Sequence, residues 1–516
     1  MTAHKHIGKI VGVLMAAAVA FCLIVTLFAD RLVAVSGSSA ATMEYESTLF
    51  DTSEIMTVNI IMDEDQWQEL LDNAISEEYY ACDVEINGET ISNVGIRAKG
   101  NTSLSSIAND PDTDRYSFKI KFDKYVDGQT CMGLDKLVLN NNFADATNRK
   151  EALVYDMFQY LGADASLYNY AKISVNGEYW GTYLALEAVE DSFKLRNYGV
   201  SDGKLYKPET MGMGNDQKEE GSNLMDRPER PQGDFDQADM DEKFRNPQGG
   251  HDDFGSFGNR NGGADLNYVD DDADSYSTIW DGADGKVTDS DKERVVTAIK
   301  NINEGTDLTT YLDVDNILKY MAVHKFVVNL DSLSGNMAHN FYLYENDGQL
   351  NIIPWDYNLS FGGMTNGGMG GGPGRESTES SGATSMINDP IDTPFDGTDF
   401  FDALLLENEE YLAQYHEYLR QLAEEYVQGG RLQEVWERLD AQTDELIETD
   451  PTAFYTAAEY EEAKETLWTV LQLRAESVLG QLDGTIPSTD DGQQNAQDTL
   501  IDGSAIDLSV MGEFNH

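Results

Sequence analysis

The first patterned part of the chain, residues 43–207, alternates hydrophobic and polar positions as β-strands do. Residues 57–62 alternate in this way, and residues 116–122 read YSFKIKF without a break in the alternation. Because successive side chains of a strand point to opposite faces, the aromatic and apolar side chains of YSFKIKF share one face. Lys119 and Lys121 lie on the other face, so the pattern predicts a strand that is buried on one side.

Two Asn-Gly pairs, at positions 87–88 and 176–177, lie between apolar runs and predict tight β-hairpin turns. Between these hairpins the period changes. Residues 148–162 carry apolar side chains every three or four positions, and Gly162 follows the last of them. This segment predicts a helix that ends at the glycine, and the order of strands, helix and strands predicts a mixed α+β fold.

The composition changes abruptly over residues 208–275, which are rich in Asp, Glu, Gly, Asn and Gln. Such a segment has too few apolar side chains to form a core, so we expect an acidic, low-complexity and disordered insertion. The apolar spacing behind Asp313 then predicts a capped helix. Residues 341–344 and 350–353 predict two strands around a turn.

The carboxy-terminal part of the chain divides into three regions. Residues 362–392 are rich in Gly, Ser and Met and predict a flexible loop, whereas residues 400–482 have the spacing of helices. Residues 483–516 carry seven acidic side chains and no Lys or Arg, so we expect a disordered acidic tail.

The amino terminus contains an uncharged apolar run, residues 10–28, that is long enough as a helix to span the core of a bilayer. Basic residues precede it, so the positive-inside rule predicts a cytoplasmic stub and a single-pass anchor over residues 1–29, with the rest extracytoplasmic. The alternative is a cleaved signal peptide, which would make the protein secreted. In either case Cys82 and Cys131 would lie in an oxidising compartment, where they could pair.

Composition and charge narrow the possible functions. The chain has 35 Lys and Arg against 93 Asp and Glu, a formal net charge of −58. This charge argues against binding to nucleic acid, because a phosphate backbone needs a basic surface. Three Cys and seven His argue against a metal site built from those side chains, so a bound metal would have oxygen ligands, as Mg²⁺ prefers.

One segment combines residues that phosphoryl-transfer enzymes use. Asp331 follows a predicted helix, Asn336 lies five residues later, and Asp356 follows the predicted strand pair. In a kinase, one carboxylate orients the acceptor hydroxyl, while an amide and a second carboxylate hold Mg²⁺ on the phosphates. From the residues alone, the alternative is that Asp331, Asn336 and Asn340 cap turns.

Six segments taken together are more specific than this spacing: GIRAKGNTS, YSFKIKF, LVLNNNFADATNRKEALVYDMFQYLG, ISVNGEYWGTYLALEAVEDSF, NLDSLSGNMAHNFYLY and IIPWDYNLSFGG. In this order they resemble the CotH kinase family, and the resemblance covers residues 57–363 outside the acidic insertion. It implies one CotH kinase-like domain over residues 43–482, with an atypical, minimal protein-kinase-like two-lobed fold and a helical carboxy-terminal region. Residues 362–392 would then occupy the position of the activation segment.

The resemblance also implies an activity, with cofactors and partners. Members of the family transfer phosphate from ATP to Ser or Thr of secreted or coat proteins, so we expect ATP with Mg²⁺ or Mn²⁺. The expected partners are a secreted, coat or cell-surface protein substrate and, through the amino-terminal helix, the membrane.

The resemblance further implies roles for the acidic residues. Asp331 looks like the catalytic carboxylate that positions the acceptor hydroxyl, Asp356 like the Mg²⁺ ligand, and Asn336 like a second metal ligand. Many relatives carry a second acidic residue two positions after the metal-binding Asp, whereas this chain has Asn358. If that position binds metal, this chain would hold the metal less tightly or have impaired catalysis.

The strand 116–122 would supply the lysine that binds the phosphates. A strand lysine beside a helix glutamate is the usual kinase arrangement, so Lys119 paired with Glu151 is the first candidate. Lys121 shares the face and is the second candidate. The alternative is that both lysines are merely solvated on an exposed face of the sheet.

Two further segments resemble nucleotide contacts. Arg97, Lys99 and Gly100, in RAKGNTS, resemble a turn that covers phosphates, although a plain hairpin end is the alternative. Glu187 ends a strand where a kinase hinge would contact adenine, and backbone atoms would make that contact. We interpret His339 as a packed or turn histidine rather than as a catalytic base.

Two hypotheses from different classes follow. The first is an extracytoplasmic, membrane-anchored CotH-type protein kinase. The second is a non-catalytic surface or coat-assembly binding protein that keeps the kinase-like fold. The acidic and lysine residues above favour the enzyme, whereas Asn358 and the difficulty of finding ATP outside the membrane favour the binding protein.

Overall fold

The computed structural model describes residues 42–210, 262–334, 338–364, 379–393, 395 and 397–512 of the chain. The predicted amino-terminal anchor, most of the acidic insertion, part of the Gly-rich loop and Asn336 lie outside the described residues. Within those ranges, no helix is both long enough and apolar enough to cross a membrane.

Seven strands close into a β-barrel in the order β1-β2-β3-β4-β5-β7-β6. They are β1 (Met56–Ile61), β2 (Tyr80–Ile86), β3 (Glu89–Lys99), β4 (Ser117–Lys121), β5 (Lys136–Asn140), β6 (Tyr168–Val175) and β7 (Glu178–Glu187). Neighbouring strands are antiparallel except β1 and β6, which pair in parallel from Met56↔Ala171 to Ile60↔Val175. Because this pairing joins the first strand to the sixth, the barrel has no free sheet edge.

The predicted hairpins and the predicted strand faces are confirmed. Both residues of each Asn-Gly pair have positive φ, 49° and 85° at positions 87–88 and 51° and 88° at 176–177, as two-residue hairpin turns require. The aromatic and apolar side chains of β4 are buried in the barrel core, and Lys119 and Lys121 are half-buried on the other face.

Short helical segments border the barrel: α3 (Glu44–Thr48), α4 (Glu64–Asp72), η1 (Ala74–Ser76) and α5 (Thr102–Ala108). The two cysteines that could pair, Cys82 and Cys131, are both free and both buried in the barrel core. Burial raises the pKa of each thiol to about 12, so neither is a reactive thiolate at neutral pH.

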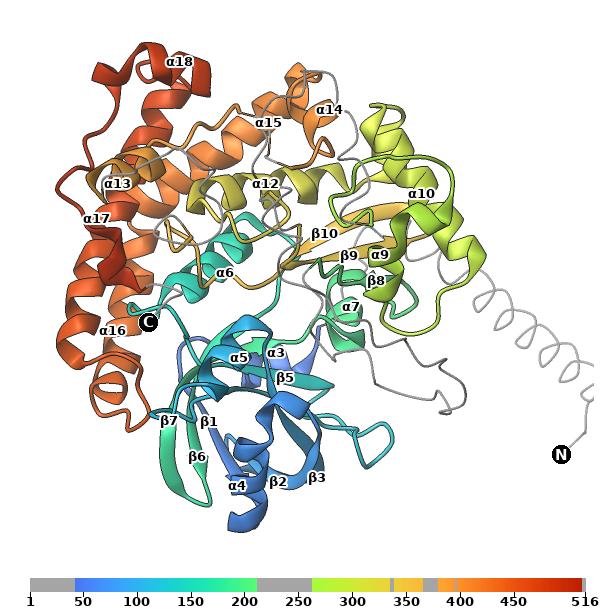
Figure 1. Cartoon of the computed structure of the whole chain (residues 1–516), viewed down its shortest axis with the longest axis vertical. Helices are drawn as coiled ribbons and strands as arrows, with labels where there is room; N and C mark the ends of the chain where they lie inside the picture. The colour runs from blue at the N-terminus through green and yellow to red at the C-terminus, as the bar shows by residue number, and fades with distance from the viewer. Residues whose placement is uncertain are drawn as a thin grey trace, which may run out of the picture.

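Helix α6 (Lys150–Leu161) leads from β5 to β6 and confirms the predicted helix. Gly162 follows it with a φ of 68°, a left-handed conformation that ends the helix and suits glycine. Helix α6 packs against α12 (Val314–Val327) and lies between the barrel and the helical part of the molecule (Figure 1).

A second, three-stranded antiparallel sheet has the order β10-β9-β8, and its strand β10 packs against α12 (Figure 1). Its strands are β8 (Lys204–Tyr206), β9 (Phe341–Asn346) and β10 (Gln349–Pro354), and α7 (Asp191–Tyr198) precedes the first of them. The two predicted strands and the predicted helix behind Asp313 are confirmed. The Asp313 side chain accepts a hydrogen bond from the Asn316 backbone N–H and caps α12.

The remaining elements of the described chain are helical, and one of them, α15, packs against α12. The elements are η4 (Ala273–Tyr276), α9 (Ser277–Asp281), α10 (Asp289–Asn303), α11 (Leu308–Tyr311), α13 (Glu379–Ile387), α14 (Asp402–Leu405), α15 (Glu409–Arg420), the π-helix η5 (Gln421–Gln428), α16 (Arg431–Glu448), α17 (Ala457–Leu482), α18 (Asp490–Asn495), η6 (Gln497–Thr499) and η7 (Leu508–Met511). In Figure 1 these helices form the upper and left parts of the molecule, and the barrel forms the lower part.

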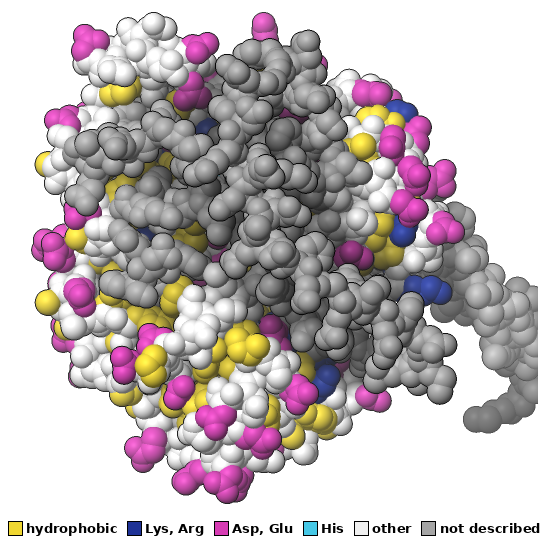
Figure 2. All heavy atoms as spheres, in the orientation of Figure 1, with side chains coloured by type: hydrophobic (Ala, Val, Ile, Leu, Met, Phe, Trp, Pro, Cys, Tyr) yellow, Lys and Arg dark blue, Asp and Glu magenta, His cyan; other side chains and the backbone are white. Residues whose placement is uncertain are grey.

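The mixed α+β class is confirmed, and the predicted kinase-like two-lobed fold is corrected, because the strand-rich part is a closed seven-stranded barrel. The alternation of side chains and the Asn-Gly turns predict most strands of the barrel, although not β5, and they carry no information about the β1–β6 pairing that closes it. Asp and Glu side chains are spread over the face drawn in Figure 2, in keeping with the net charge of −58.

The prediction of a disordered tail over residues 483–516 is wrong for its described part. Residues 483–512 contain α18, η6 and η7, and Leu508 and Met511 of η7 are buried in the main hydrophobic core. The backbone N–H of Ala146 donates a 3.1 Å hydrogen bond to the Met511 carbonyl. The many acidic residues led to the prediction that the tail is solvated, but its few apolar side chains are enough to pack it against the main hydrophobic core.

Two other disorder predictions are corrected in part. The predicted insertion, residues 208–275, ends in ordered structure, since Ala264 and Leu266 are fully buried. The predicted Gly-rich loop, residues 362–392, contains helix α13. In both segments, ordered structure lies inside the range that was predicted to be disordered. The boundaries predicted from composition alone are therefore too wide.

Candidate functional site

The candidate site lies where the ends of β3 and β5 meet the first turn of α6. The Nζ of Lys99, the last residue of β3, donates a 2.7 Å hydrogen bond to the Oδ1 of Asn140. The Nδ2 of Asn140, the last residue of β5, donates a 2.8 Å hydrogen bond to the Oε2 of Glu151 on α6. The amide therefore links a strand lysine to a helix glutamate.

Glu151 is buried, and its environment disfavours its charge. Burial and the charge of Asp356 raise the pKa of Glu151, and the hydrogen bond from Asn140, the charge of Lys99 and the Tyr357 backbone N–H act against this rise. Its second oxygen, Oε1, has no hydrogen-bond partner within the part of the chain that the structure describes. A buried carboxylate oxygen without a partner can accept a cation or a donor from a ligand.

Asp356 follows β10 and is the second carboxylate of the site. Its φ of 62° lies in the left-handed region, which is uncommon for a residue other than glycine and turns the chain sharply after Trp355. Burial raises the pKa of Asp356, as does the charge of Asp331, whereas the charges of Lys99, Lys207 and His339 lower it. The Nζ of Lys99 also lies 5.8 Å from the centre of the Trp355 ring.

Asp331 is held by two neighbours from its own loop. The Nε2 of His339 lies 2.6 Å from Oδ1 of Asp331, and the Nδ2 of Asn340 donates to Oδ2 at 3.0 Å and to the Asp331 carbonyl at 2.8 Å. Burial opposes a charge on His339, but the hydrogen bond and charge of Asp331, with Glu209 and Asp356, raise the pKa of His339 above its usual value.

The contacts of the Asp331 loop can be compared with both interpretations of its polar residues, as parts of a kinase site and as caps of turns. Asn340 bonds to the backbone, as the turn-capping alternative expects, but it also orients the Asp331 carboxylate. His339 is half-buried and binds that carboxylate, so the interpretation of a packed or turn histidine gains a specific partner, Asp331. The third residue, Asn336, lies outside the described residues.

The donor set suits a hard divalent cation bound together with phosphate. No cluster of three or more His, Cys, Asp and Glu side chains arranged to hold a metal exists in the described ranges. Mg²⁺ is commonly held by one or two carboxylates, with phosphate oxygens and water completing its shell. Asp356 is the candidate for such a carboxylate. The charge of Asp331 acts on Asp356, and the charge of Asp356 acts on Glu151, whose Oε1 has no hydrogen-bond partner among the described residues.

The predicted pairing of Lys119 with Glu151 is corrected. Lys119 on β4 lies opposite Arg97 on β3 and Val138 on β5. The lysine whose charge acts on Glu151 is Lys99, which lies two residues beyond Arg97 at the end of β3 nearest the start of α6. The alternation identified the face of the sheet, but it could not show which lysine on that face is next to the helix.

The second candidate, Lys121, lies opposite Lys136 in the sheet, and its Nζ is 4.0 Å from Oδ1 of Asp123. Arg97, which was expected in a phosphate-covering turn, is buried, forms an ion pair with Glu77 and lies over the ring of Tyr79. These contacts favour a structural role for Arg97.

The turn after Lys99 requires glycine. Gly100 has a φ of 133°, and a Cβ there would lie 2.9 Å from the Oγ of Ser103. The glycine lets the chain pass directly from β3 into α5, which keeps Lys99 at the end of its strand.

Glu187 is a structural anchor rather than a side chain available to a nucleotide. Its carboxylate is fully buried and accepts hydrogen bonds from Tyr45 Oη at 2.5 Å, Arg196 Nη2 at 2.6 Å and the Leu167 backbone N–H at 3.1 Å. Its own backbone N–H donates to the Leu167 carbonyl at 2.9 Å. These contacts commit the Glu187 side chain and N–H to the fold, and the expectation that backbone atoms of this hinge segment contact adenine stays a prediction.

Two residues near Asp356 add to what the sequence indicated. The Nδ2 of Asn358 donates a 3.0 Å hydrogen bond to the Phe143 carbonyl, which an ionised acidic side chain could not do. Lys207, which follows β8, acts on Asp356 through its charge and forms a 2.7 Å ion pair with Glu209. No pattern in the sequence indicated the effect of Lys207 on the site, because Asp356 is far away along the chain.

A model of a known protein family matches most of the chain. The model of the family described as "CotH kinase protein" matches residues 96–478. The match includes β3 with Lys99, helix α6 with Glu151, and both Asp331 and Asp356. A search of curated proteins found no match.

Proposed function

The chain belongs to the CotH kinase family, and from this membership we propose that it is a protein kinase that transfers the γ-phosphate of ATP to Ser or Thr hydroxyls. The observation that carries the proposal is the link from Lys99 through Asn140 to Glu151, with Asp356 in the same electrostatic cluster. A strand lysine, a helix glutamate and a metal-binding aspartate are the parts that kinase chemistry requires.

Each of these side chains has a task that follows from its place. Lys99 carries the positive charge nearest the two buried carboxylates, so it would hold negative phosphate oxygens beside Asp356. Asn140 and Glu151 fix the lysine by hydrogen bonding, because Asn140 contacts both. This arrangement keeps the ammonium group in place before a nucleotide arrives, which lowers the cost of organising the site.

Asp331 is the residue that would orient the acceptor hydroxyl. His339 and Asn340 each occupy one of its oxygens, which fixes the plane of the carboxylate. Asp356 would hold Mg²⁺ or Mn²⁺, with Asn336 as the expected second ligand. The metal with bound ATP would supply the transferable phosphoryl group and neutralise the charge that develops on it.

The proposed location is the outer side of the cell membrane, with residues 10–28 as a single-pass anchor, or secretion if that segment is cleaved. A secreted, coat or cell-surface protein is the proposed phosphate acceptor. A non-catalytic binding protein remains the second candidate. The observation in its favour is Asn358, whose amide bonds to the Phe143 carbonyl where many relatives carry an acid.

The test is incorporation of labelled phosphate by the purified full chain, with ATP and either Mg²⁺ or Mn²⁺ and a panel of Ser- and Thr-containing acceptors. Asp356→Asn should abolish incorporation, because it removes the charged metal ligand. Asp498→Asn, at an exposed position, is the matched control and should behave as the native chain. Equal labelling by both variants would contradict the role of Asp356. An absence of labelling with either metal would favour the binding protein.

A further inference from the structure

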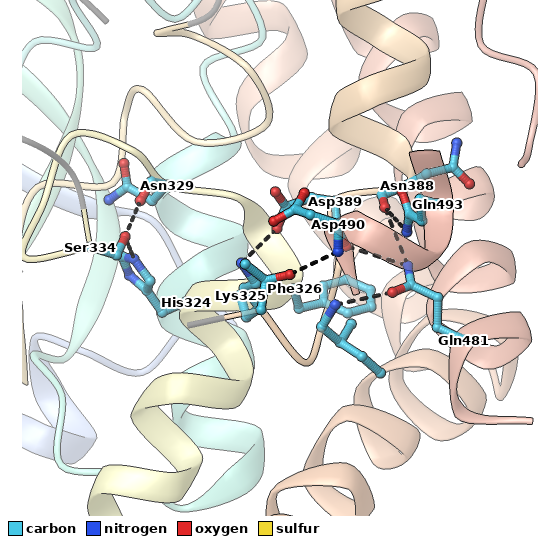
Figure 3. A network of polar contacts seen from close by, with 12 residues as sticks. His324, Lys325, Phe326, Asn329, Ser334, Asn388, Asp389, Gln481, Asp490 and Gln493 are labelled. Carbon is cyan, nitrogen blue, oxygen red and sulfur yellow. Dashed lines mark hydrogen bonds and ion pairs between the residues drawn. The ribbon is translucent and has the colours of Figure 1, made fainter. Parts of the chain in front are cut away.

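His324, on α12, is a buried histidine to which the proposed chemistry gives no task. Its Nε2 lies 2.5 Å from the Oγ of Ser334 and 3.1 Å from the Oγ of Ser332. Figure 3 shows the ring next to Ser334 and Asn329. At its other end, Nδ1 lies 3.1 Å from the Oη of Tyr357. One ring therefore joins the loop that follows Asp331 to the segment that follows Asp356.

The hydrogen bonds around the ring define its tautomer. The hydroxyls of Ser332 and Ser334 both donate to the Asn329 carbonyl, at 3.2 and 3.1 Å. Each hydroxyl has a single hydrogen, so when both hydrogens go to this carbonyl, Nε2 of His324 is the donor to Ser334. Nδ1 is then an acceptor and receives the hydroxyl hydrogen of Tyr357.

A neutral ring is what this pattern needs, since one ring nitrogen donates and the other accepts. Burial lowers the pKa of His324 to about 3, with a further lowering by the charge of Lys325. The ring is held in place by the stacked ring of Tyr320, whose centre is 5.4 Å away. The histidine is therefore a rigid connector with fixed donor and acceptor ends.

Tyr357 extends the connection to the third element of the site. Its ring packs edge-on against Phe158 and Tyr155 of α6, with ring centres 5.4 and 6.5 Å apart. The same helix carries Glu151, and the Tyr357 backbone N–H favours the charged form of that carboxylate, because it lowers the pKa of Glu151. The segments that bear Asp331, Asp356 and Glu151 therefore meet around His324 and Tyr357.

We propose that His324 is a positioning residue that fixes Asp331 and Asp356 relative to each other, with its neutral ring as the link between their loops. An apolar ring of similar size would fill the same space but would release both loops, because packing lacks the two directional bonds. The expected effect of His324 on phosphate transfer rests on the proposed function. Its expected effect on the mobility of the two loops, the mechanical part, does not.

Hydrogen exchange of the full chain tests the mechanical part. In His324→Phe, which keeps a ring but loses both bonds, peptides that contain residues 331–334 and 356–361 should exchange faster than in the native chain. Tyr357→Phe should speed only the second peptide, and the double variant Ser332→Ala/Ser334→Ala only the first. Helix α17 should be unchanged in all of them.

The control is His416→Gln, because His416 is half-exposed and bonds to Asp392 away from these loops. The proposal would be overturned if both peptides exchanged at the native rate in His324→Phe. It would also be overturned if exchange in α17 increased as much as exchange in the two peptides. If His324→Phe fails to fold, the Tyr357 and serine variants decide the question. Faster exchange only in the segment that carries each variant's substitutions supports the link through His324. Unchanged exchange in both segments overturns it.

Kinetics test the catalytic part. His324→Phe should lower kcat by about 100-fold, because misplacing catalytic groups by about 1 Å has effects of that size. His324→Gln, whose amide offers one donor and one acceptor, should recover a large part of kcat, and equal losses in both variants would overturn the need for the two bonds. If the native chain shows no phosphate transfer, the proposed function fails, and the exchange pattern still decides the role of His324.

Discussion

Lys99 Nζ donates a 2.7 Å hydrogen bond to Asn140 Oδ1, and through that amide the end of β3 is joined to helix α6. The lysine's charge lowers the pKa of both Glu151 and Asp356, against the burial that raises them. The positive charge of Lys99 is thus already committed to two carboxylates before any phosphate binds. This relationship makes Lys99 the most informative side chain of the site to change.

Lys99→Met should lower kcat/KM for phosphate transfer by about 100-fold, the effect of removing one preorganised charge from a catalytic site. It should also raise the pKa of Glu151 and Asp356 further, because the charge that opposes burial is gone. Steady-state kinetics with ATP as the varied substrate measures the first effect.

Lys121→Met provides the control, since Lys121 lies on β4 near Asp123 rather than at the two buried carboxylates. We expect a change of no more than about twofold, as for a partly exposed surface charge. A larger loss for Lys121→Met than for Lys99→Met would contradict the assignment made from the structure.

Most strands of the barrel could be predicted from the sequence because their signals are local, whereas the short strand β5 was missed. Asn-Gly at positions 87–88 and 176–177 needs no tertiary contact to favour positive φ, and the alternation of residues 116–122 follows from one buried face. Gly162 likewise ends α6 through its own conformational freedom. Closure of the barrel depends on the pairing of β1 with β6, which lie more than a hundred residues apart.

The site was predictable in part for the same reason. Asp331, Asp356 and Glu151 follow from spacing and resemblance, but the choice between Lys99 and Lys119 depends on where β3 ends relative to α6. His324 gave no sequence signal at all, because a histidine in an apolar helix looks like any core residue until its partners from two other segments are known.

Glu187→Ala should destabilise the barrel by about 3–5 kcal/mol, because it leaves the guanidinium of Arg196 buried without its partner. Chemical denaturation measures the free energy of unfolding. Glu424→Ala is the matched control, since its ion pair with Arg420 is largely exposed, and it should change stability by no more than about 0.5 kcal/mol. Similar losses in the two variants would show that Glu187 is not an anchor.

Asp135 should make stability depend on pH. Burial raises its pKa to about 6, in spite of hydrogen bonds from the Ser192 backbone N–H and hydroxyl. Because the folded state holds the proton more tightly than the unfolded chain, the native chain loses stability at this site as pH rises from 4 to above 6.

Asp135→Asn cannot ionise and can still bond to Ser192. Its stability relative to the native chain should therefore rise by about 2 kcal/mol between pH 4 and pH 7, given that one pKa unit corresponds to about 1.4 kcal/mol. Thermal unfolding at several pH values measures the difference. A difference that stays constant with pH, as we expect for the exposed control Asp498→Asn, would contradict a raised pKa at Asp135.

Met511→Ala should destabilise the chain by about 2–5 kcal/mol, the usual cost of truncating a buried Met. The side chain packs in the main core, and the Met511 carbonyl accepts a hydrogen bond from Ala146 in the loop before α6, so the loss should also loosen that loop. Urea denaturation gives the free energy, and hydrogen exchange of residues 142–148 reports on the loop. Ser504→Ala, at an exposed position of the same tail, is the control. Equal stability of the two variants would mean that the acidic tail does not pack against the core. That result would agree with the disordered tail that the composition predicts.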